Sequence, residues 1–312
     1  MSFVPNTNPT QQRRPTLVHS AEPDGDETVS TFGKQQDRNI GDIFRETRNL
    51  TDEQIATITE HQRAKGLRFG ESAVALGIAT RADVIFALSQ QFHYPYVPEA
   101  RRNICRELVL ANQPFSKQAE AVRSIRSQLL MHALNPKEQH RAMAVISPES
   151  GDGKTYFVAN LGVALAQMGG RVLVVDADLR GPRLHEVFGI PNTTGLSSIL
   201  SGRQEESVIH QSHDIPGLYV MPVGITPPNP LELLERPAFR LLLGELVRRF
   251  DHVLVDTPAL QEGCDTTVIA NKCGLALALA RKNKTRINRL DQLLAAVNSS
   301  ATRLAGVVVN EF

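Results

Sequence analysis

Short apolar runs alternate with helical patterns over the C-terminal half of the chain. The runs are Met143–Ser147, Arg171–Asp178, Leu218–Gly224, His252–Ala259, Leu275–Ala280 and Ala305–Asn310. Each run is apolar at consecutive positions, which is typical of parallel strands covered by helices on both faces. We therefore predict an α/β fold for residues 141–312, a doubly wound and mostly parallel sheet with ligands beyond the carboxyl ends of its strands.

The N-terminal third has a different pattern. Residues 1–37 are rich in Pro, Thr, Gln and Asp and have no hydrophobic period, so we expect a disordered tail. Residues 38–98 contain an internal repeat, in which Asn39–Phe44 aligns with Arg68–Ala73. Each repeat unit predicts a short helix, a turn and a second helix, and Thr51 is the expected N-cap of the second helix in the first unit.

A connector over residues 99–140 joins the small helical module to the predicted sheet. Its hydrophobic spacing predicts an amphipathic helix from about Lys117 to Leu134. Glu120, Arg123 and Arg126 fall on one face of this helix, because residues three apart are neighbours on a helix surface. The spacing alone is compatible with a simple solvated face.

The composition fits a soluble globular protein of one large and one small domain: 312 residues, 41% hydrophobic, 21% charged, with a net charge of +1. The near-neutral balance gives no indication of a nucleic-acid partner. Three cysteines without paired spacing do not predict a disulfide framework or a zinc site. No apolar run approaches the roughly 20 residues that span a bilayer, and the N-terminus has no signal-like run. We therefore expect a cytoplasmic protein.

A phosphate-binding turn follows the first predicted strand of the sheet. Ser150–Thr155 reads Ser-Gly-Asp-Gly-Lys-Thr and opens a predicted helix over Tyr156–Met168. Glycines let backbone N–H groups turn inward around phosphate oxygens, and the helix N-terminus favours negative charge. Lys154 would reach the β- and γ-phosphates and Thr155 would bind Mg²⁺, so the fold is of the P-loop NTPase type. Pro148 replaces the first glycine of the usual motif.

Three aspartates end two of the predicted strands. Asp176 and Asp178 close one strand with side chains on the same side, and Asp256 closes another. Mg²⁺ takes hard oxygen ligands and keeps several waters, so Thr155, one or two carboxylates and ATP oxygens would complete its shell. One aspartate is then left to orient or deprotonate an incoming hydroxyl.

The segments Gly151–Thr155, Val174–Arg180 and Val253–Pro258 resemble the Walker A, A′ and B motifs of bacterial tyrosine autokinases of polysaccharide synthesis and export. The likeness also covers His185–Gly202 and Pro227–Phe239, and it extends over about two thirds of the chain. The resemblance implies an ATP- and Mg²⁺-dependent protein-tyrosine kinase of exopolysaccharide production and chain length. It also implies the residue roles, with Asp176 as the base-like group and Asp178 and Asp256 beside the metal.

The expected site is therefore as follows. Nucleotide contacts are expected from Ser150, Gly151, Asp152, Gly153, Lys154, Thr155, Tyr156, Arg180 and Asn310; catalysis from Lys154, Asp176 and Asp178; and metal binding from Thr155, Asp178 and Asp256. The alternative is a non-kinase P-loop ATPase switch that binds a membrane partner in its ATP state. The aspartate pair favours the kinase, and the lack of a tyrosine-rich tail after Phe312 favours the switch.

The resemblance also implies partners. Kinases of this family pack a Glu-x-x-Arg-x-x-Arg helix between the subunits of a ring, which predicts a homo-oligomer through Glu120, Arg123 and Arg126. Family members work with a transmembrane chain-length determinant, so a separate membrane protein would recruit this chain to the inner face of the plasma membrane. The tail-less arrangement is similar to EpsG-type kinases, and self-phosphorylation is expected only at Tyr94 and Tyr96.

The helical module over residues 38–98 resembles the cyclic di-GMP-binding domain found before type II secretion and pilus ATPases. Leu67–Gly70, Leu76–Ile78 and Gln91 carry this likeness. The first unit has Asn39 where an arginine is expected, and an asparagine cannot stack on guanine or hold a phosphate by two bonds. Binding of cyclic di-GMP and plain docking of a protein both stay open for this module.

Overall fold

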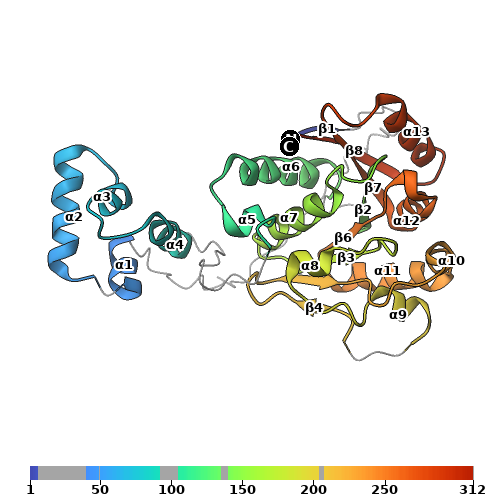
Figure 1. Ribbon diagram of the computed structural model, residues 1–312, viewed down its shortest axis with the longest axis horizontal. Coiled ribbons are helices and arrows are strands. Elements are labelled where there is room, and N and C mark those ends of the chain that lie inside the picture. Colours follow the sequence, from blue (N-terminus) through green and yellow to red (C-terminus); the bar gives the residue numbers. More distant parts are fainter. Residues whose placement is uncertain (6–39, 49, 92–104, 135–139, 204–206, 312) are drawn as a thin grey trace, which may run out of the picture. The chain divides into compact units, whose positions relative to one another are not determined.

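The computed structural model describes residues 1–5, 40–48, 50–91, 105–134, 140–203 and 207–311 (Figure 1). The chain divides into two compact units, which are treated separately here. One unit contains Thr7–His93, and the other contains Met1–Asn6 together with Tyr94–Phe312. None of the helices in the described ranges is long and apolar enough to cross a bilayer.

Within its described residues, 40–48 and 50–91, the smaller unit has four helices: α1 (Ile40–Arg48), α2 (Asp52–Lys65), α3 (Phe69–Ala75) and α4 (Arg81–Gln91). The capping box at α2 is present, since the Thr51 N–H donates to Gln54 Oε1 at 3.0 Å and the Gln54 N–H to Thr51 Oγ1 at 3.3 Å. Phe44, Ile58 and Ala87 are buried in its core. The predicted pairs of helices are confirmed.

The larger unit is built on one eight-stranded sheet. Its strands are β1 (Ser2–Pro5), β2 (Ala142–Ile146), β3 (Val172–Asp176), β4 (His210–Gln211), β5 (Leu218–Met221), β6 (His252–Asp256), β7 (Gly274–Arg281) and β8 (Arg303–Asn310). They lie in the order β1-β8-β7-β2-β6-β3-β5-β4, and only the two edge pairs are antiparallel. The predicted doubly wound, mostly parallel sheet is therefore confirmed.

Helices cover both faces of this sheet (Figure 1). One face packs against α5 (Val109–Asn112), α6 (Lys117–His132), α7 (Lys154–Ala166) and α8 (Leu184–Phe188). The other packs against α9 (Leu196–Leu200), α10 (Pro230–Glu235), α11 (Pro237–Arg249), α12 (Asp265–Cys273) and α13 (Ile287–Asn298), and a 3₁₀ turn spans Leu260–Glu262. Side chains alternate between the two cores along each strand, as the pleat requires.

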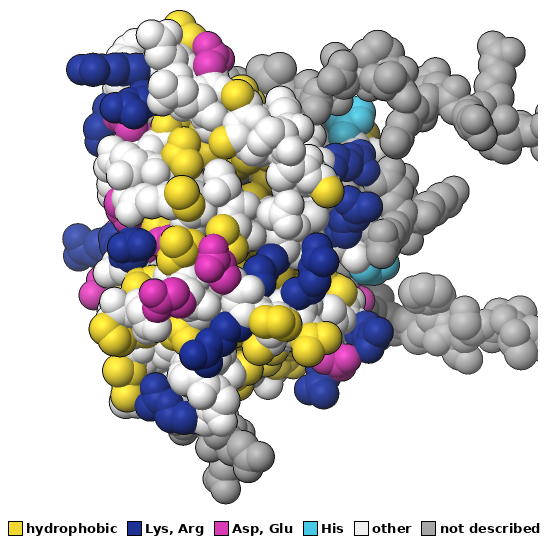
Figure 2. Space-filling model, turned by 90° about the vertical axis from the view of Figure 1, so that its right-hand side faces the viewer, with side chains coloured by type: hydrophobic (Ala, Val, Ile, Leu, Met, Phe, Trp, Pro, Cys, Tyr) yellow, Lys and Arg dark blue, Asp and Glu magenta, His cyan; other side chains and the backbone are white. Residues whose placement is uncertain are grey.

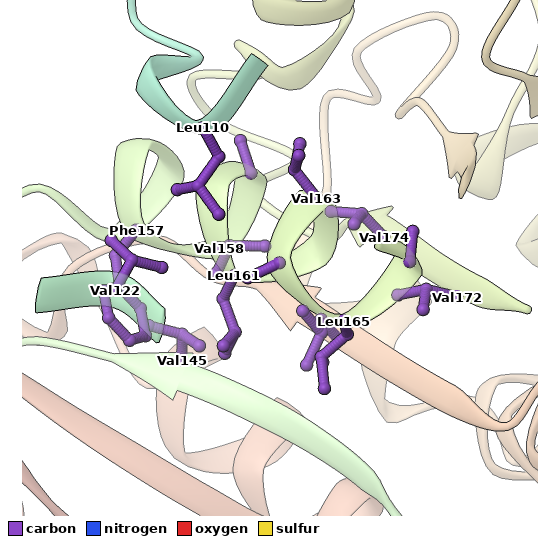
Figure 3. Close-up of a cluster of buried hydrophobic side chains, with 14 of the residues drawn as sticks. Leu110, Val122, Val145, Phe157, Val158, Leu161, Val163, Leu165, Val172 and Val174 are labelled. Atoms are coloured by element: carbon purple, nitrogen blue, oxygen red, sulfur yellow. The ribbon is translucent and has the colours of Figure 1, made fainter. Parts of the chain in front are cut away.

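The helix that carries the phosphate-binding turn lies deep in the molecule. Figure 3 shows the apolar side chains around α7, with Phe157 and Leu161 between neighbouring elements. A Cβ atom on Gly162 would lie 2.6 Å from Val174 Cγ2, so glycine is needed where α7 approaches β3. This close packing holds the first turn of α7 at the carboxyl edge of the sheet.

Two strands were not expected. Residues Ser2–Pro5 pair with β8 instead of belonging to a disordered tail, because the exposed edge of β8 supplies the partner that the local sequence lacks. The short β4 adds to the other edge beside β5. The remainder of the expected tail, residues 6–37, and the two acceptor candidates Tyr94 and Tyr96 lie outside the described residues.

Candidate nucleotide site

The turn between β2 and α7 has the backbone of a phosphate-binding loop. Gly151 and Gly153 adopt positive φ angles of 78° and 95°, a region that side-chain-bearing residues rarely enter. Gly153 immediately precedes Lys154, the first residue of α7. The first-turn N–H groups of a helix lack intrahelical acceptors and attract anions. The loop therefore offers an anion site.

Asp152 braces this loop from inside. Its carboxylate is fully buried and accepts hydrogen bonds from the Glu149 N–H at 3.0 Å and from Thr285 Oγ1 at 2.8 Å. Asn310 Nδ2 donates to the Asp152 carbonyl at 3.2 Å. The loop is thus tied to the ends of β7 and β8. The side chain of Asp152 supports the loop, and only its backbone remains for a nucleotide.

Lys154 and Thr155 each bond to a residue at the end of a strand. Lys154 Nζ donates to Ser147 Oγ at 2.9 Å, just beyond β2. Thr155 Oγ1 donates to Asp256 Oδ2 at 2.6 Å, at the end of β6. The structure therefore brings the predicted lysine, hydroxyl and carboxylate together beside the anion site.

Two buried carboxylates face each other at the ends of adjacent strands. Asp176 and Asp256 are register partners in β3 and β6, and both are at most 1% exposed. Burial, followed by the negative charge of Asp256, raises the pKa of Asp176 well above its ordinary value. Burial also raises the pKa of Asp256 to about 6, although Thr155 and Lys154 favour its ionised form. The pair therefore favours a bound cation.

Asp176 and Asp178 have different surroundings. The buried Asp176 carboxylate accepts bonds from the backbone N–H groups of Asp178, Arg183 and Leu184 at 3.2, 3.1 and 3.0 Å. Asp178 is partly exposed, and its Oδ1 accepts from the N–H groups of Arg180 and Gly181. Asp176 thus fixes the segment after β3, and Asp178 sits at its more accessible turn.

The sequence of residues 143–312, more than half of the 312-residue chain, matches the CobQ/CobB/MinD/ParA nucleotide binding domain. The chain belongs to this family. The match begins in β2 and runs to the last residue, so it contains every nucleotide and metal residue predicted above. The CobQ/CobB/MinD/ParA domain here thus corresponds to the sheet-based part of the larger unit after the connector.

Several proteins similar to this chain are named tyrosine kinases. The tyrosine-protein kinase ptk of Acinetobacter johnsonii is 32% identical over 192 residues, which cover 62% of this chain and 26% of ptk. The putative tyrosine-protein kinase CapB of Staphylococcus aureus is 28% identical over 214 residues, 68% of this chain and 92% of CapB. The kinase domain of Escherichia coli tyrosine kinase ETK is 29% identical with a TM-score of 0.64, and the likeness covers 68% of this chain and 82% of that domain. The chain thus spans about a quarter of ptk.

A link that the sequence did not predict joins the loops after β3 and β6. Arg180 Nε forms a short ion pair with Asp265, which is 1% exposed at the start of α12. Asp265 Oδ1 has no hydrogen-bond partner in the described part of the chain. Because Arg180 belongs to the turn that holds Asp178, Asp265 positions that turn. The only indication of this ion pair in the sequence was that Asp265 begins a helix after the strand that ends at Asp256.

The donor set of this CobQ/CobB/MinD/ParA domain fits Mg²⁺ only with ligands from a nucleotide and water. In the described ranges, no three His, Cys, Asp or Glu side chains converge closely enough to hold a metal by themselves. The Thr155 hydroxyl and the Asp256 carboxylate already meet at 2.6 Å, and Asp178 acts on Asp256 through its charge. Mg²⁺ ordinarily uses one or two carboxylates and keeps several waters, so the fit is acceptable.

The remaining predicted residues are placed as follows. Asn310 is 1% exposed at the end of β8, and its Oδ1 has no partner among the described residues. Burial raises the pKa of the half-buried Tyr156 hydroxyl, and Glu107 adds to this effect. On α6, Arg123 bonds to Glu120 at 3.2 Å, and Arg126 Nη1 donates to the Ala164 carbonyl at 3.0 Å. The two arginines therefore also serve packing within the chain.

Proposed function

We propose that this chain is an ATP- and Mg²⁺-dependent protein-tyrosine kinase that regulates exopolysaccharide polymerisation, export and chain length. The observation that carries the proposal is the placement of Asp178. It lies two residues beyond β3, partly exposed, and close enough to Asp256 for its charge to act on that carboxylate, which accepts a hydrogen bond from Thr155. A partly exposed carboxylate beside the buried Asp256 suits transfer to a hydroxyl group. The names of ptk, CapB and the ETK kinase domain support the same chemistry.

The phosphate-binding loop and Lys154 would hold the triphosphate. Backbone N–H groups of Ser150–Thr155 would surround the phosphates, and Lys154, which donates to Ser147 Oγ in this structure, would instead donate to the β- and γ-phosphate oxygens. Thr155, Asp256 and Asp178 would hold Mg²⁺, directly or through water. The bound ion neutralises charge that develops on the γ-phosphate. Lys154 would add its own positive charge at the same oxygens.

Asp176, at the end of β3, and Asp178, two residues beyond it, would act on the acceptor. A tyrosine hydroxyl with an ordinary pKa of about 10 must lose its proton as it attacks. The raised pKa of Asp176 suits proton acceptance, and this role for Asp176 stays a prediction. Its backbone bonds give it the further task of fixing the segment that ends at Leu184. Asp178, on the accessible side, would orient the incoming hydroxyl or the metal.

The base of the nucleotide would lie at the end of β8. Asn310 Oδ1 is buried without a partner among the described residues, while its Nδ2 is bound to the loop. An unpaired buried acceptor costs free energy, which a donor from adenine would recover. Adenine carries an exocyclic amino group, so Asn310 is a fitting contact. Tyr156 and Arg180 would lie at the margins of the same site.

The partners follow from the same reading. We infer that the chain works in the cytoplasm at the inner face of the plasma membrane, where a separate transmembrane chain-length determinant recruits it. A homo-oligomer would form through the α6 face with Glu120, which is 75% exposed. Arg123 and Arg126 would have to share their internal bonds with the neighbouring subunit. Cyclic di-GMP binding by residues 38–98 stays a prediction, and no nucleic acid is expected.

The decisive experiment separates phosphotyrosine from free phosphate. The purified protein is incubated with γ-labelled ATP and Mg²⁺, with and without a glutamate–tyrosine copolymer as acceptor. A kinase gives acid-stable label on tyrosine that is lost in Lys154→Met. Steady release of free phosphate without any phosphotyrosine, on the copolymer or on lysate proteins, would instead identify an ATPase switch.

A further inference from the structure

The loop between β7 and α13, with the first turn of α13, is strongly basic. Five cations and no acid lie between residues 281 and 289: Arg281, Lys282, Lys284, Arg286 and Arg289. Lys282 is paired with Glu311 at 3.3 Å. The other four, Arg281, Lys284, Arg286 and Arg289, are called the basic rim below. Since the whole chain has a net charge of only +1, this concentration is local.

The basic rim touches the phosphate-binding loop. Lys284 Nζ lies 3.4 Å from the Ser150 carbonyl oxygen, and Arg281 Nη1 lies 3.4 Å from that of Gly151. Thr285, which follows Lys284, donates a hydrogen bond to Asp152 of the same loop. The rim therefore starts at the mouth of the nucleotide site and continues outward along α13. Any polypeptide that enters the site from this side meets it.

The cations occupy the wrong end of α13 for the stability of that helix. Arg286 is its N-cap, Arg289 is in its first turn, no side chain caps the turn, and the turn contains no acidic residue. The N-terminus of a helix carries partial positive charge and normally attracts Asp, Glu or a capping oxygen. Arg286 and Arg289 therefore go against the usual preference for acidic or capping residues at a helix N-terminus and bring the helix no stability. Such departures are expected where residues serve binding.

The surface is open and mixed in character. Ile287, between the two arginines, is 75% exposed. Figure 2 faces the side of the molecule on which α13 lies in Figure 1, and it shows Lys and Arg side chains standing out among exposed hydrophobic ones. Cations spread along a loop and a helix turn fit an extended ligand with several negative charges. The exposed isoleucine adds a contact for an apolar side chain, which a polypeptide provides.

We propose that the basic rim binds the acceptor polypeptide, and that it selects segments in which acidic residues flank the tyrosine. The inference rests on the proposed kinase function and names its substrate class. Acidic residues would pair with Arg286 and Arg289 and complete the uncapped N-terminus of α13. Lys284 and Arg281 would lead the chain toward the γ-phosphate. The hydroxyl group of the acceptor tyrosine would then lie beside Asp178.

The test compares two charge reversals in the full chain. Arg286→Glu/Arg289→Glu changes the basic rim, whereas Arg248→Glu/Arg249→Glu makes the same change in net charge on α11. Arg248 and Arg249 precede the first residue of β6, whereas Asp256 is its last residue, so the two arginines lie at the other end of that strand. Because acidic residues suit a helix N-terminus, the rim variant should melt no lower than the unchanged protein.

The first readout is binding without turnover. A fluorescent glutamate–tyrosine copolymer is titrated with each protein at low and moderate salt. We expect roughly tenfold weaker binding for the rim variant only, with salt weakening the unchanged protein more steeply than the variant. Equal affinity for all three proteins overturns the proposal. Tighter binding of a single-stranded oligonucleotide or of phosphatidylserine vesicles, lost in the same variant, also overturns it.

The second readout is transfer to tyrosine. In the rim variant, KM for the acidic copolymer should rise about as much as the binding constant, while a near-neutral tyrosine copolymer should be phosphorylated as before. An equal loss with both copolymers overturns the proposed selectivity. If the unchanged protein labels no tyrosine at all, the kinase function fails. The binding readout still decides whether the rim recognises acidic polypeptides.

Discussion

The brace under the phosphate-binding loop can be removed with one substitution. Thr285→Val keeps the shape of the side chain and deletes the hydroxyl, which donates to Asp152 Oδ1 at 2.8 Å and accepts from the Arg281 N–H at 2.7 Å. Among the described residues, the Asp152 carboxylate then keeps only the bond from the Glu149 N–H on its other oxygen. A buried carboxylate would be left half-paired at the centre of the loop.

The magnitude follows from those two bonds. Leaving a buried group unpaired costs about 1–3 kcal/mol, with charged groups at the upper end. Asp152 is fully buried, whereas the Arg281 N–H lies at the half-buried end of β7, where water can replace the lost acceptor. The loss of stability should therefore be about 2–3 kcal/mol, set mainly by Asp152. For a unit of this size it lowers the melting temperature by roughly 4–10 °C.

The assay is thermal melting with and without Mg·ATP, and Thr285→Ser is the matched control because it keeps the hydroxyl. The valine variant should melt lower and bind ATP more weakly, since its loop is no longer held open for phosphate. The serine variant should stay close to the unchanged protein. A valine variant that melts within a degree of the unchanged protein would refute the brace, and so would a serine variant that loses as much.

Three further predictions concern the site. Lys154→Met should lower ATP turnover by about two orders of magnitude, the effect of losing a transition-state charge contact of about 3 kcal/mol. A near-normal kcat in steady-state kinetics would remove Lys154 from the mechanism. Asp176→Asn should reduce phosphoryl transfer and also the melting temperature, because an amide cannot accept all three backbone bonds. Asp178→Asn should instead raise the Mg²⁺ concentration that activity requires. If both variants changed transfer, melting temperature and Mg²⁺ requirement in the same way, this division of roles would be wrong. Mass spectrometry after incubation with Mg·ATP should find no substantial phosphate on Tyr156, in α7, or on Tyr219, in β5, because neither can easily swing into a neighbour's site. A high yield on either tyrosine would contradict this argument.

Much of the sheet could be predicted because most of its strands have a recognisable local sequence pattern. Runs of consecutive apolar positions need cover on both faces, and β2, β3, β5, β6, β7 and β8 all overlap such runs. Parallel strands end at one edge, so the phosphate-binding turn, Asp176 and Asp256 could be expected to meet there. The structure places Asp176 and Asp256 as register partners.

The supports of the site could not be predicted in this way. Thr285 reaches Asp152 across 133 positions of sequence, and Arg180 reaches Asp265 across 85. A lone threonine in a basic loop and a lone aspartate at a helix start have no spacing that marks them. Strand β1 was missed for a related reason, since four residues that include a proline carry no period. These four residues form a strand because β8 supplies the backbone partner.

The pairing of Ser2 with Val309 and of Pro5 with Gly306 has a consequence for synthesis on the ribosome. Of the strands described here, β1 is made first and β8 last, so this pairing must wait until β8 has left the exit tunnel. The helices over residues 40–91 make contacts within a short stretch of sequence and can form much earlier. A shortened protein that starts after those helices would expose the backbone edge of β8. Such an edge invites pairing between molecules, so aggregation should accompany loss of the first five residues.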